Sequence, residues 1–423
     1  MITKITTLGI AIVLYLSTAV QAQSVTAYLN QNKADINTGI KKGGILNKEF
    51  FNHQVFLLGE IHGVQKPQEI DLNLLALLNK EAGVRTYVAE VDFAKAYFLN
   101  QYLKTGNESL IDTVFADWDR QTAQWANKDF QQKIRNIRKL NQTLPAGKTI
   151  SFVGIDQVHN PALAAHYFDE VLTSRNLKAL KPRFEKLITL LRTPKVDSLV
   201  ANEARQLLNQ LNSENNQGYY RPSYNQVVFG LEVCAAMASK SREKVIYNNF
   251  KYLYKQLNWS KYKVYGFWGF FHVLQSKTNA GKGQSFTNAL LNDPDLNLKG
   301  KIVSIACLYS GSKIMMPTAS LPQMWAEKGK RYSAVSQFNN DGPLMNVSNL
   351  TPFKEISQPN TLTLFKLDGA GSPLLTEKAD IKYHAFMPKD QQIMLNEDGK
   401  FMADYFQYLI LIRNSEATTP INN

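Results

Sequence analysis

The chain has 423 residues, of which 44% are hydrophobic and 20% are charged, so it has enough apolar side chains to bury a sizeable core. This composition excludes a disordered or fibrous protein. The formal net charge is +13, but the basic residues are scattered along the chain, which argues against a nucleic-acid-binding module with a basic stripe and stacking aromatic residues.

The first 22 residues are predicted to be an export signal. A single charge at Lys4 precedes the short apolar run "LGIAIVLYL", and Val20–Ala22 offers small residues for cleavage before Gln23. A membrane anchor is the alternative, but the run is shorter than the roughly 20 residues that a spanning helix needs. No later segment of the sequence is long and apolar enough to span, so we expect a periplasmic or secreted protein.

Three strand-and-helix pairs follow the predicted signal. In each pair, a short apolar run is followed by a segment with apolar residues at helical spacing. Alternation of this kind predicts an α/β fold, with a mostly parallel central sheet flanked by helices. The predicted strands lie in residues 55–59, 84–92 and 149–157, and the predicted helices in residues 66–83, 93–103 and 161–172.

The rest of the chain continues the same predicted domain, which we place at residues 23–413. A helical insertion is expected at about residues 177–257, and strands resume at residues 262–270, 300–308, 360–367 and 405–413. The polar tail, residues 414–423, is expected to be loose. Cys234 and Cys307 lie in apolar contexts and are interpreted as inert core thiols, although a single disulfide stays open for an exported protein.

Ionisable residues follow four of the predicted strands. Glu60 and His62 follow the first, Glu90 the second, Asp156 the third, and His272 the strand that ends near residue 269. Ligands of open parallel sheets bind outside the carboxyl ends of the strands, so these side chains are expected to line one crevice. Each histidine alone could be a hydrogen-bonded structural residue, but the set favours a functional site.

Two of these histidines share a G-x-x-H motif, at residues 59–62 and 269–272. Together with "VAEVD" at residues 88–92 and "GIDQ" at residues 154–157, the motifs resemble the superfamily of erythromycin esterases, haem-binding ChaN proteins and Tiki proteases. The segment "SREKVIYNNF" is similar to the arginine-acid helix of the erythromycin esterase branch. The spacing from Gly59 to His62 is one residue shorter than is usual in erythromycin esterases, and it is more similar to the Tiki and ChaN pattern.

That helix contributes two further candidates, Arg242 and Asn249. They are seven residues apart, nearly two helical turns, so we expect both to point from one face toward the crevice. A charged surface helix with no functional role is the alternative. Arg242, Asn249 and Asp156 are interpreted as substrate-binding residues.

The resemblance implies an exported hydrolase that attacks an ester, lactone or amide with activated water. A carboxylate near His62 favours its imidazolium, and we expect this histidine to take a proton from water near neutral pH. His272 would stabilise the oxyanion or donate to the leaving group, and Glu90 would orient an imidazole. The sequence has no G-x-S-x-G, H-E-x-x-H or P-loop motif, which argues against serine esterases, zincins and nucleotide hydrolases. The partner would be a small-molecule or peptide substrate.

Two other functions stay open at this point. The ChaN resemblance implies a binding protein that holds haem or another ligand with His62, His272 or a tyrosine. The Tiki resemblance implies a metal-dependent peptidase, in which Glu60, His62, Glu90 and His272 hold a divalent ion such as Mn²⁺ or Co²⁺. His53, His166 and His384 lack a comparable position and are interpreted as structural.

Overall fold

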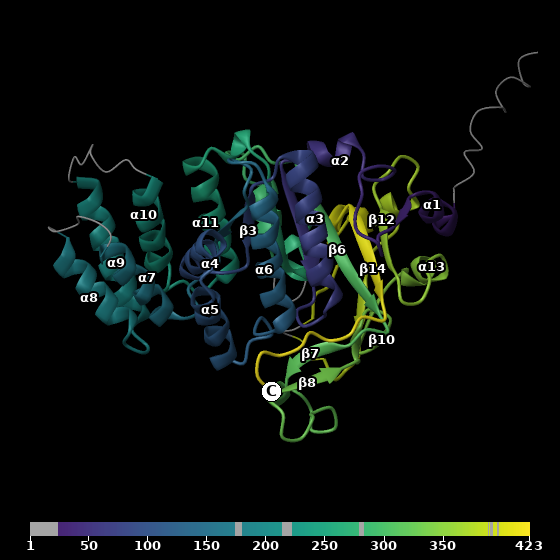
Figure 1. The fold of residues 1–423 in the computed structure, drawn as a ribbon. Coiled ribbons are helices and arrows are strands. Elements are labelled where there is room, and N and C mark those ends of the chain that lie inside the picture. Colours follow the sequence, from purple (N-terminus) through teal and green to yellow (C-terminus); the bar gives the residue numbers. More distant parts are fainter. Residues whose placement is uncertain are drawn as a thin grey trace, which may run out of the picture.

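The computed structural model describes most of the chain (Figure 1). The described residues are 24–173, 180–213, 222–278, 283–387, 389, 392–395 and 397–423. The predicted export signal, residues 1–22, lies outside them. Among the residues described, no helix has the length and apolar character needed to cross a membrane.

An eight-stranded sheet forms the centre of the molecule, which confirms the predicted α/β fold. The strand order is β1-β12-β14-β6-β2-β5-β3-β4, and pairing is parallel from β14 to β4 and antiparallel among β1, β12 and β14. The strands are β1 (Lys33–Asp35), β2 (Val55–Glu60), β3 (Thr86–Ala89), β4 (Ser151–Gly154), β5 (Val264–Gly269), β6 (Ile302–Ser310), β12 (Leu362–Lys366) and β14 (Tyr408–Arg413).

Helices cover the sheet, and β2 and β6 are buried along their whole length. Burial on both faces is typical of inner parallel strands and explains their continuous apolar runs. The helices beside the sheet are α1 (Val25–Gln31), α2 (Lys48–Asn52), α3 (Lys66–Ala82), α4 (Phe93–Thr105), α5 (Glu108–Arg120), α6 (Lys128–Thr143), α11 (Arg242–Gln256), α12 (Phe286–Leu291), α13 (Leu350–Glu355) and α14 (Met402–Tyr405). Gly83, in the left-handed conformation at φ 72°, ends α3 as its pattern predicts.

A group of helices extends the molecule beyond the β4 edge, at the left of Figure 1. It contains α7 (Pro161–Thr173), α8 (Lys181–Leu191), α9 (Asp197–Ser213) and α10 (Pro222–Ala235). Small strand pairs lie at the lower right, near the carboxyl ends of the parallel strands. They are formed by β7 (Ile314–Pro317), β8 (Tyr332–Val335), β9 (Phe338–Asn339), β10 (Gly342–Pro343), β11 (Met345–Val347) and β13 (Ile381–Tyr383).

The carboxyl-terminal tail is not loose, so that prediction was wrong. Ala417 forms a β-bridge with Val64, and the Thr418 amide donates to the Gly63 carbonyl oxygen at 2.9 Å. The Ile421 amide donates to the Ala126 carbonyl oxygen at 3.0 Å. The tail is therefore held against the body of the protein mainly by backbone hydrogen bonds, which its polar composition does not reveal.

Both cysteines are free and buried, so the disulfide that the sequence left open is not formed. Cys234 lies on α10 and Cys307 on β6. Burial raises the pKa of both thiols, which keeps them protonated.

Candidate active site

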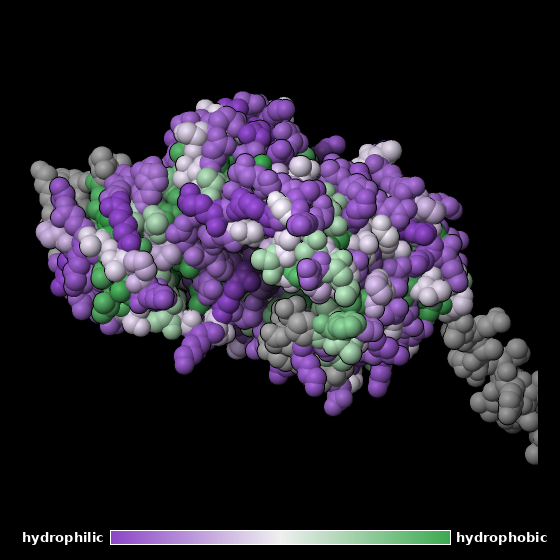
Figure 2. All heavy atoms as spheres, turned by 90° about the horizontal axis from the view of Figure 1, so that it is seen from below, coloured by the Kyte–Doolittle hydropathy of each residue, from purple (hydrophilic) through white to green (hydrophobic). Residues whose placement is uncertain are grey.

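A cleft of about 460 Å³ opens where β2, β3 and β5 end. Figure 2, which views the molecule from below, shows a hollow with mainly hydrophilic walls near the middle of this face. The structure brings Glu60, His62, Glu90 and His272 together here, as the sequence predicts for strand ends on one edge of a sheet. The other lining residues are Ile61, Gln124, Ser241, Arg242, Glu243, Gly269, Phe270, Phe271 and Ile393.

The glycines of the two G-x-x-H motifs have steric roles. A Cβ atom at Gly59 would lie 2.3 Å from Cγ2 of Val273, so only glycine lets the turn after β5 pack against β2. A Cβ atom at Gly269 would lie 3.4 Å from Nε2 of His62 and 3.4 Å from Cδ2 of His272. The two imidazoles therefore face the same point, which Gly269 leaves open.

His62 binds carboxylates through both ring nitrogens. Its Nδ1 contacts Oε1 of Glu60, and its Nε2 lies 3.8 Å from Oε1 of Glu90, while Trp125 packs against the ring at 4.2 Å between centroids. Burial lowers the pKa of His62, but the two carboxylates outweigh it and raise that pKa to about 10. The imidazolium is favoured as predicted, but His62 is then already protonated near neutral pH and becomes a base only at higher pH.

Glu60 is buried at the end of β2, with 1% of its surface exposed. Burial raises its pKa, although the charge of His62 acts in the opposite direction. Its Oε2 atom has no hydrogen-bond partner among the residues that the structure describes. The contact with His62 is therefore the main interaction that offsets the burial of the Glu60 carboxylate.

Glu90 is the charged centre of the site. Its Oε2 accepts a hydrogen bond from the Gly269 amide at 2.7 Å, and its Oε1 accepts one from Nη2 of Arg242 at 2.8 Å. Burial raises the pKa of Glu90, but His272 and His62 outweigh it and hold that pKa well below its usual range. As a permanent carboxylate at the end of β3, Glu90 can orient both imidazoles and the guanidinium.

His272 lies in the short turn after β5 and is held between charged groups. Its Nδ1 is 2.8 Å from Oε1 of Glu243, and its Nε2 is 3.4 Å from Oε1 of Glu90 and 3.1 Å from Nη1 of Arg242. Burial lowers the pKa of His272, but Glu90 and Glu243 outweigh it and raise that pKa to about 9. Because an arginine can only donate, its contact with Nε2 is a hydrogen bond only in the neutral ring, whereas the carboxylates favour the imidazolium.

Glu243 is a site residue that the sequence reasoning did not single out. Besides its contact with His272, it accepts a hydrogen bond through Oε2 from the Phe286 amide at 2.8 Å, which ties α11 to the start of α12. The sequence did contain one indication of this residue, because an arginine followed by an acidic residue begins the helix. Its role could not be assigned, because residue 243 meets residue 272 only in the folded chain.

Arg242 reaches the cleft, but Asp156 does not line it. Asp156, with 1% of its surface exposed, accepts from Nε of Arg242 at 2.9 Å and from Nη2 at 2.6 Å. Burial raises the pKa of Asp156, but His159 and Arg242 outweigh it and lower that pKa to about 2. The predicted substrate-binding role of Asp156 is therefore corrected to the positioning of Arg242 by a two-point ion pair.

Asn249 does not line the cleft either, so its predicted role at the substrate was wrong. Its side chain is buried and donates through Nδ2 to the Ile155 carbonyl oxygen at 2.8 Å. The seven-residue spacing correctly places Arg242 and Asn249 on one side of α11. However, a rise of about 1.5 Å per residue carries Asn249 about 10 Å farther along the axis, past the end of the cleft.

Comparison with known proteins agrees with this arrangement. The family model described as erythromycin esterase matches residues 80–253, a segment that includes Glu90, Asp156 and Arg242. The predicted resemblance to the erythromycin esterase family is confirmed. Both G-x-x-H motifs lie outside the matched segment, so their place in the site comes from the structure. No curated protein matches the chain.

Three solved structures share the fold over nearly the whole chain. A protein from Bacillus cereus has 15% identity and a TM-score of 0.70, and covers 94% of this chain and 98% of its own. A succinoglycan biosynthesis protein has 14% identity and a TM-score of 0.67, with 95% and 98% covered. A mutant of the erythromycin esterase EreC in its open conformation has 12% identity and a TM-score of 0.62, with 92% and 100% covered.

The four residues considered for a divalent metal do not fit one as they are arranged. Among the described parts of the chain, no group of three or more histidine, cysteine or acidic side chains could hold a metal ion. The atoms that would bind it, Oε1 of Glu90 and Nε2 of His272, both face the guanidinium of Arg242, at 2.8 and 3.1 Å. A cation there would have to displace this fixed positive charge.

Proposed function

We propose that this chain is a hydrolase that uses His62 to activate water against an ester, lactone or amide. The observation that carries the proposal is the orientation of His62, whose Nδ1 binds buried Glu60 while its Nε2 faces the point opposite His272. A base held by a carboxylate on one nitrogen, whose other nitrogen lies at the cleft 3.8 Å from Oε1 of Glu90, is suited to take a proton from water once that nitrogen is deprotonated. The erythromycin esterase resemblance supports the same class of reaction.

In the proposed reaction, the reactive form of His62 has a proton on Nδ1 and none on Nε2. Nε2 takes a proton from water while the water oxygen forms a bond with the substrate carbonyl carbon. Charge then develops on the carbonyl oxygen, beside Arg242 and the imidazolium of His272. His62 returns the proton to the leaving oxygen or nitrogen as its bond to carbon breaks, which releases an acid and an alcohol or amine.

The substrate carbonyl is proposed to approach from the side of Arg242. Arg242 is fixed by Asp156 and Glu90, so its guanidinium is already in place before charge develops. A charge held in place costs no reorganisation during the reaction, which is the basis of electrostatic stabilisation in enzymes. The three carboxylates around the cleft, Glu60, Glu90 and Glu243, are each paired with a cationic side chain.

The test is hydrolysis of a panel of nitrophenyl esters, lactones, including erythromycin, and peptide amides. His62→Ala is expected to lower kcat/KM by about 10²- to 10⁴-fold, as the loss of a positioned base does. His53→Ala is the matched control, because His53 lies at the opposite end of β2 and contacts the Phe50 carbonyl oxygen through Nδ1 at 2.9 Å. Equal loss in both variants, with unchanged melting temperatures, would refute the role of His62.

The same preparation separates the two other functions. A Soret band after haem addition, with no turnover of any substrate, would indicate a binding protein instead. Turnover that is abolished by a chelator and restored by Mn²⁺ or Co²⁺ would indicate a metal-dependent peptidase. Turnover that survives chelation and is lost in His62→Ala would support the hydrolase proposed above.

We also propose that the protein is exported to the periplasm or outside the cell. The support is the short apolar run in residues 1–22 and the small residues before Gln23. Mass spectrometry of the protein recovered after expression with its native leader is expected to give a chain that begins at Gln23. A chain that begins at Met1, or one that stays in membranes after a carbonate wash, would contradict export.

A further inference from the structure

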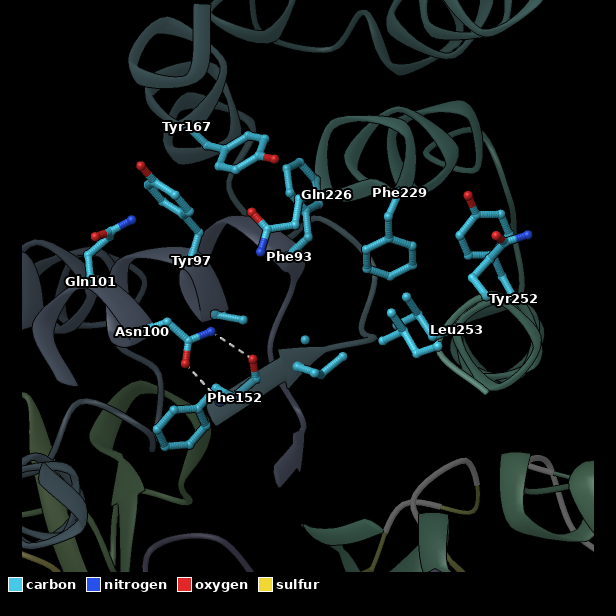
Figure 3. Close-up of a pocket in the computed structure, with 15 residues that line it drawn as sticks. Phe93, Tyr97, Asn100, Gln101, Phe152, Tyr167, Gln226, Phe229, Tyr252 and Leu253 are labelled. Carbon is cyan, nitrogen blue, oxygen red and sulfur yellow. Dashed lines mark hydrogen bonds between the residues drawn. The ribbon is translucent and has the colours of Figure 1, made fainter. Parts of the chain in front are cut away.

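A second cavity, of about 290 Å³, lies at the β4 edge of the sheet (Figure 3). Its walls come from β4 and from helices α4, α7, α10 and α11, so it lies between the sheet and the helices that extend beyond it. None of its lining residues lines the cleft described above. Junctions between structural units are frequent places for small-molecule sites.

The walls of this cavity are aromatic and uncharged. Six aromatic residues line it, Phe93, Tyr97, Phe152, Tyr167, Phe229 and Tyr252. The polar side-chain groups are the hydroxyl groups of the three tyrosines and the amides of Asn100, Gln101, Gln226 and Gln256. None of the lining residues within the described chain is acidic, basic or histidine, although 20% of the sequence is charged.

Contacts between the wall residues fix the shape of the cavity. Asn100 donates through Nδ2 to the Phe152 carbonyl oxygen and accepts from the Phe152 amide, both at 2.8 Å, so its side chain closes the open edge of β4. Tyr167 packs edge-on against Phe93, with ring centroids 5.0 Å apart. These interactions hold the walls without a ligand, so binding would cost little ordering entropy.

The cavity has a solvent-exposed rim, which includes Gln226, and buried walls, which include Phe93 and Tyr167. The volume approaches the lower end of known ligand pockets, about 300 Å³. Amides at the rim, such as that of the exposed Gln226, can bond to polar groups of a ligand but cannot neutralise a charge.

We propose that this cavity binds an uncharged, mainly apolar molecule with planar rings and one or two hydrogen-bonding groups. Planar rings would pack against the aromatic walls, and a donor or acceptor would reach the amides at the rim. A charged ligand would lose its hydration without gaining an ion pair. The site is independent of the hydrolase activity proposed above, because the two share no residue.

The test uses N-phenyl-1-naphthylamine, a neutral amine that joins a phenyl ring to a naphthalene and whose fluorescence rises when it leaves water. Gln226→Glu places a charge at the mouth of the cavity and is expected to weaken probe binding by about tenfold or more. Gln226→Leu is the matched control, since it keeps the site neutral and is expected to bind the probe at least as well. Because residue 226 is exposed, neither change should affect folding.

A second variant, Ala96→Met, tests whether the probe occupies the cavity. Ala96 lines the cavity from α4, and a flexible methionine there would enter the empty volume, so the melting temperature should not fall while probe binding is lost. His62→Ala should retain full probe affinity, which separates this cavity from the cleft. The proposal is overturned if the wild-type protein does not bind the probe, if the charge at residue 226 changes nothing, or if His62→Ala abolishes binding.

Discussion

The ionisable side chains around the cleft carry charges that depend on one another. Glu90 holds the imidazoliums of His62 and His272, and these in turn keep Glu90 ionised despite its burial. The protons of such a cluster leave in macroscopic steps that belong to the group and not to one residue. The pH dependence of the rate is therefore the most direct measure of whether this cluster performs the chemistry.

We predict an alkaline optimum for hydrolysis. His62 must lose its Nε2 proton to act as a base, so kcat/KM should rise about tenfold per pH unit from neutral pH toward the pKa of about 10. His272 acts as an imidazolium, so the rate should level or fall once its pKa of about 9 is passed. A pH–rate profile with a midpoint near the ordinary histidine pKa, about 6.5, would contradict these assignments.

The two motif glycines give a second prediction. Gly269→Ala should fold normally, because its φ of −56° suits any residue, but the new methyl group would occupy the point between the two imidazoles. We expect kcat/KM to fall about 10- to 100-fold through displacement of water and of the rings. The measurement is the rate together with the melting temperature.

Gly59→Ala is the contrasting variant. Its methyl group would clash with the Val273 side chain at 2.3 Å, so we expect a loss of about 1–3 kcal/mol in the free energy of unfolding. Stability loss in Gly59→Ala and rate loss in Gly269→Ala would separate packing from chemistry. If both variants lose only stability, the point between the imidazoles has no catalytic meaning.

Among the elements, α11 links the site to the edge of the sheet. Ser241 caps its N-terminus by accepting from the Lys244 amide, Arg242 and Glu243 enter the cleft from its first turn, and Asn249 anchors it to the end of β4. The sequence predicted this helix and the position of Arg242 at the cleft, because a charged pair at a helix start is a local pattern. It could not show that Asn249 lies outside the cleft, since that depends on where the neighbouring strand ends.

We predict that Asp156→Asn lowers kcat/KM by about tenfold or more while the protein stays folded. The change keeps the shape of the side chain but removes the charge that holds Arg242 at two points. Arg242 would then sample other positions, so kcat should fall more than KM rises.

Asn249→Ala, on the same helix, serves as the comparison for Asp156→Asn. It should lose about 1–2 kcal/mol in the free energy of unfolding, because the hydrogen bond to the Ile155 carbonyl oxygen disappears, with a smaller effect on rate. Thermal melts and steady-state kinetics of both variants distinguish a loss of stability from a loss of rate. An unchanged kcat in Asp156→Asn would show that Arg242 needs no anchor.

For the whole molecule, local patterns predicted the parallel strands of the sheet better than the antiparallel pairing at its β1 edge. The predicted strand at 55–59 and the predicted helix at 66–83 correspond to β2 and α3, because hydrophobic periodicity and helix-end signals act over a few residues. The antiparallel partners β1 and β12 pair residues more than 300 positions apart, and no local signal specifies such a pairing. For the same reason, the sequence did not indicate the positions of Glu243 and Gln124 or the order of the tail. These depend on contacts that form only in the folded chain.

The tail provides the last prediction, because it lies against the loop that leaves the candidate base. Thr418 donates through its amide to the Gly63 carbonyl oxygen, next to His62, and the Gln65 amide donates to the Glu416 carbonyl oxygen at 3.0 Å. Gln124 holds the other side of this loop, donating to the His62 carbonyl oxygen at 2.8 Å. Removal of residues 415–423 would therefore free one side of the segment that positions the imidazole.

We expect this truncation to lower kcat/KM by about 10²-fold, as small displacements of a catalytic group do, and to lower the melting temperature. Thr418→Ala, which removes the hydroxyl and γ-methyl groups and keeps the backbone bond to Gly63, should change both quantities little. Protection of the Thr418 amide from hydrogen exchange in the full chain would confirm that the tail is ordered in solution. Full activity in the truncated protein would show that the loop after His62 is held by Gln124 and the sheet alone.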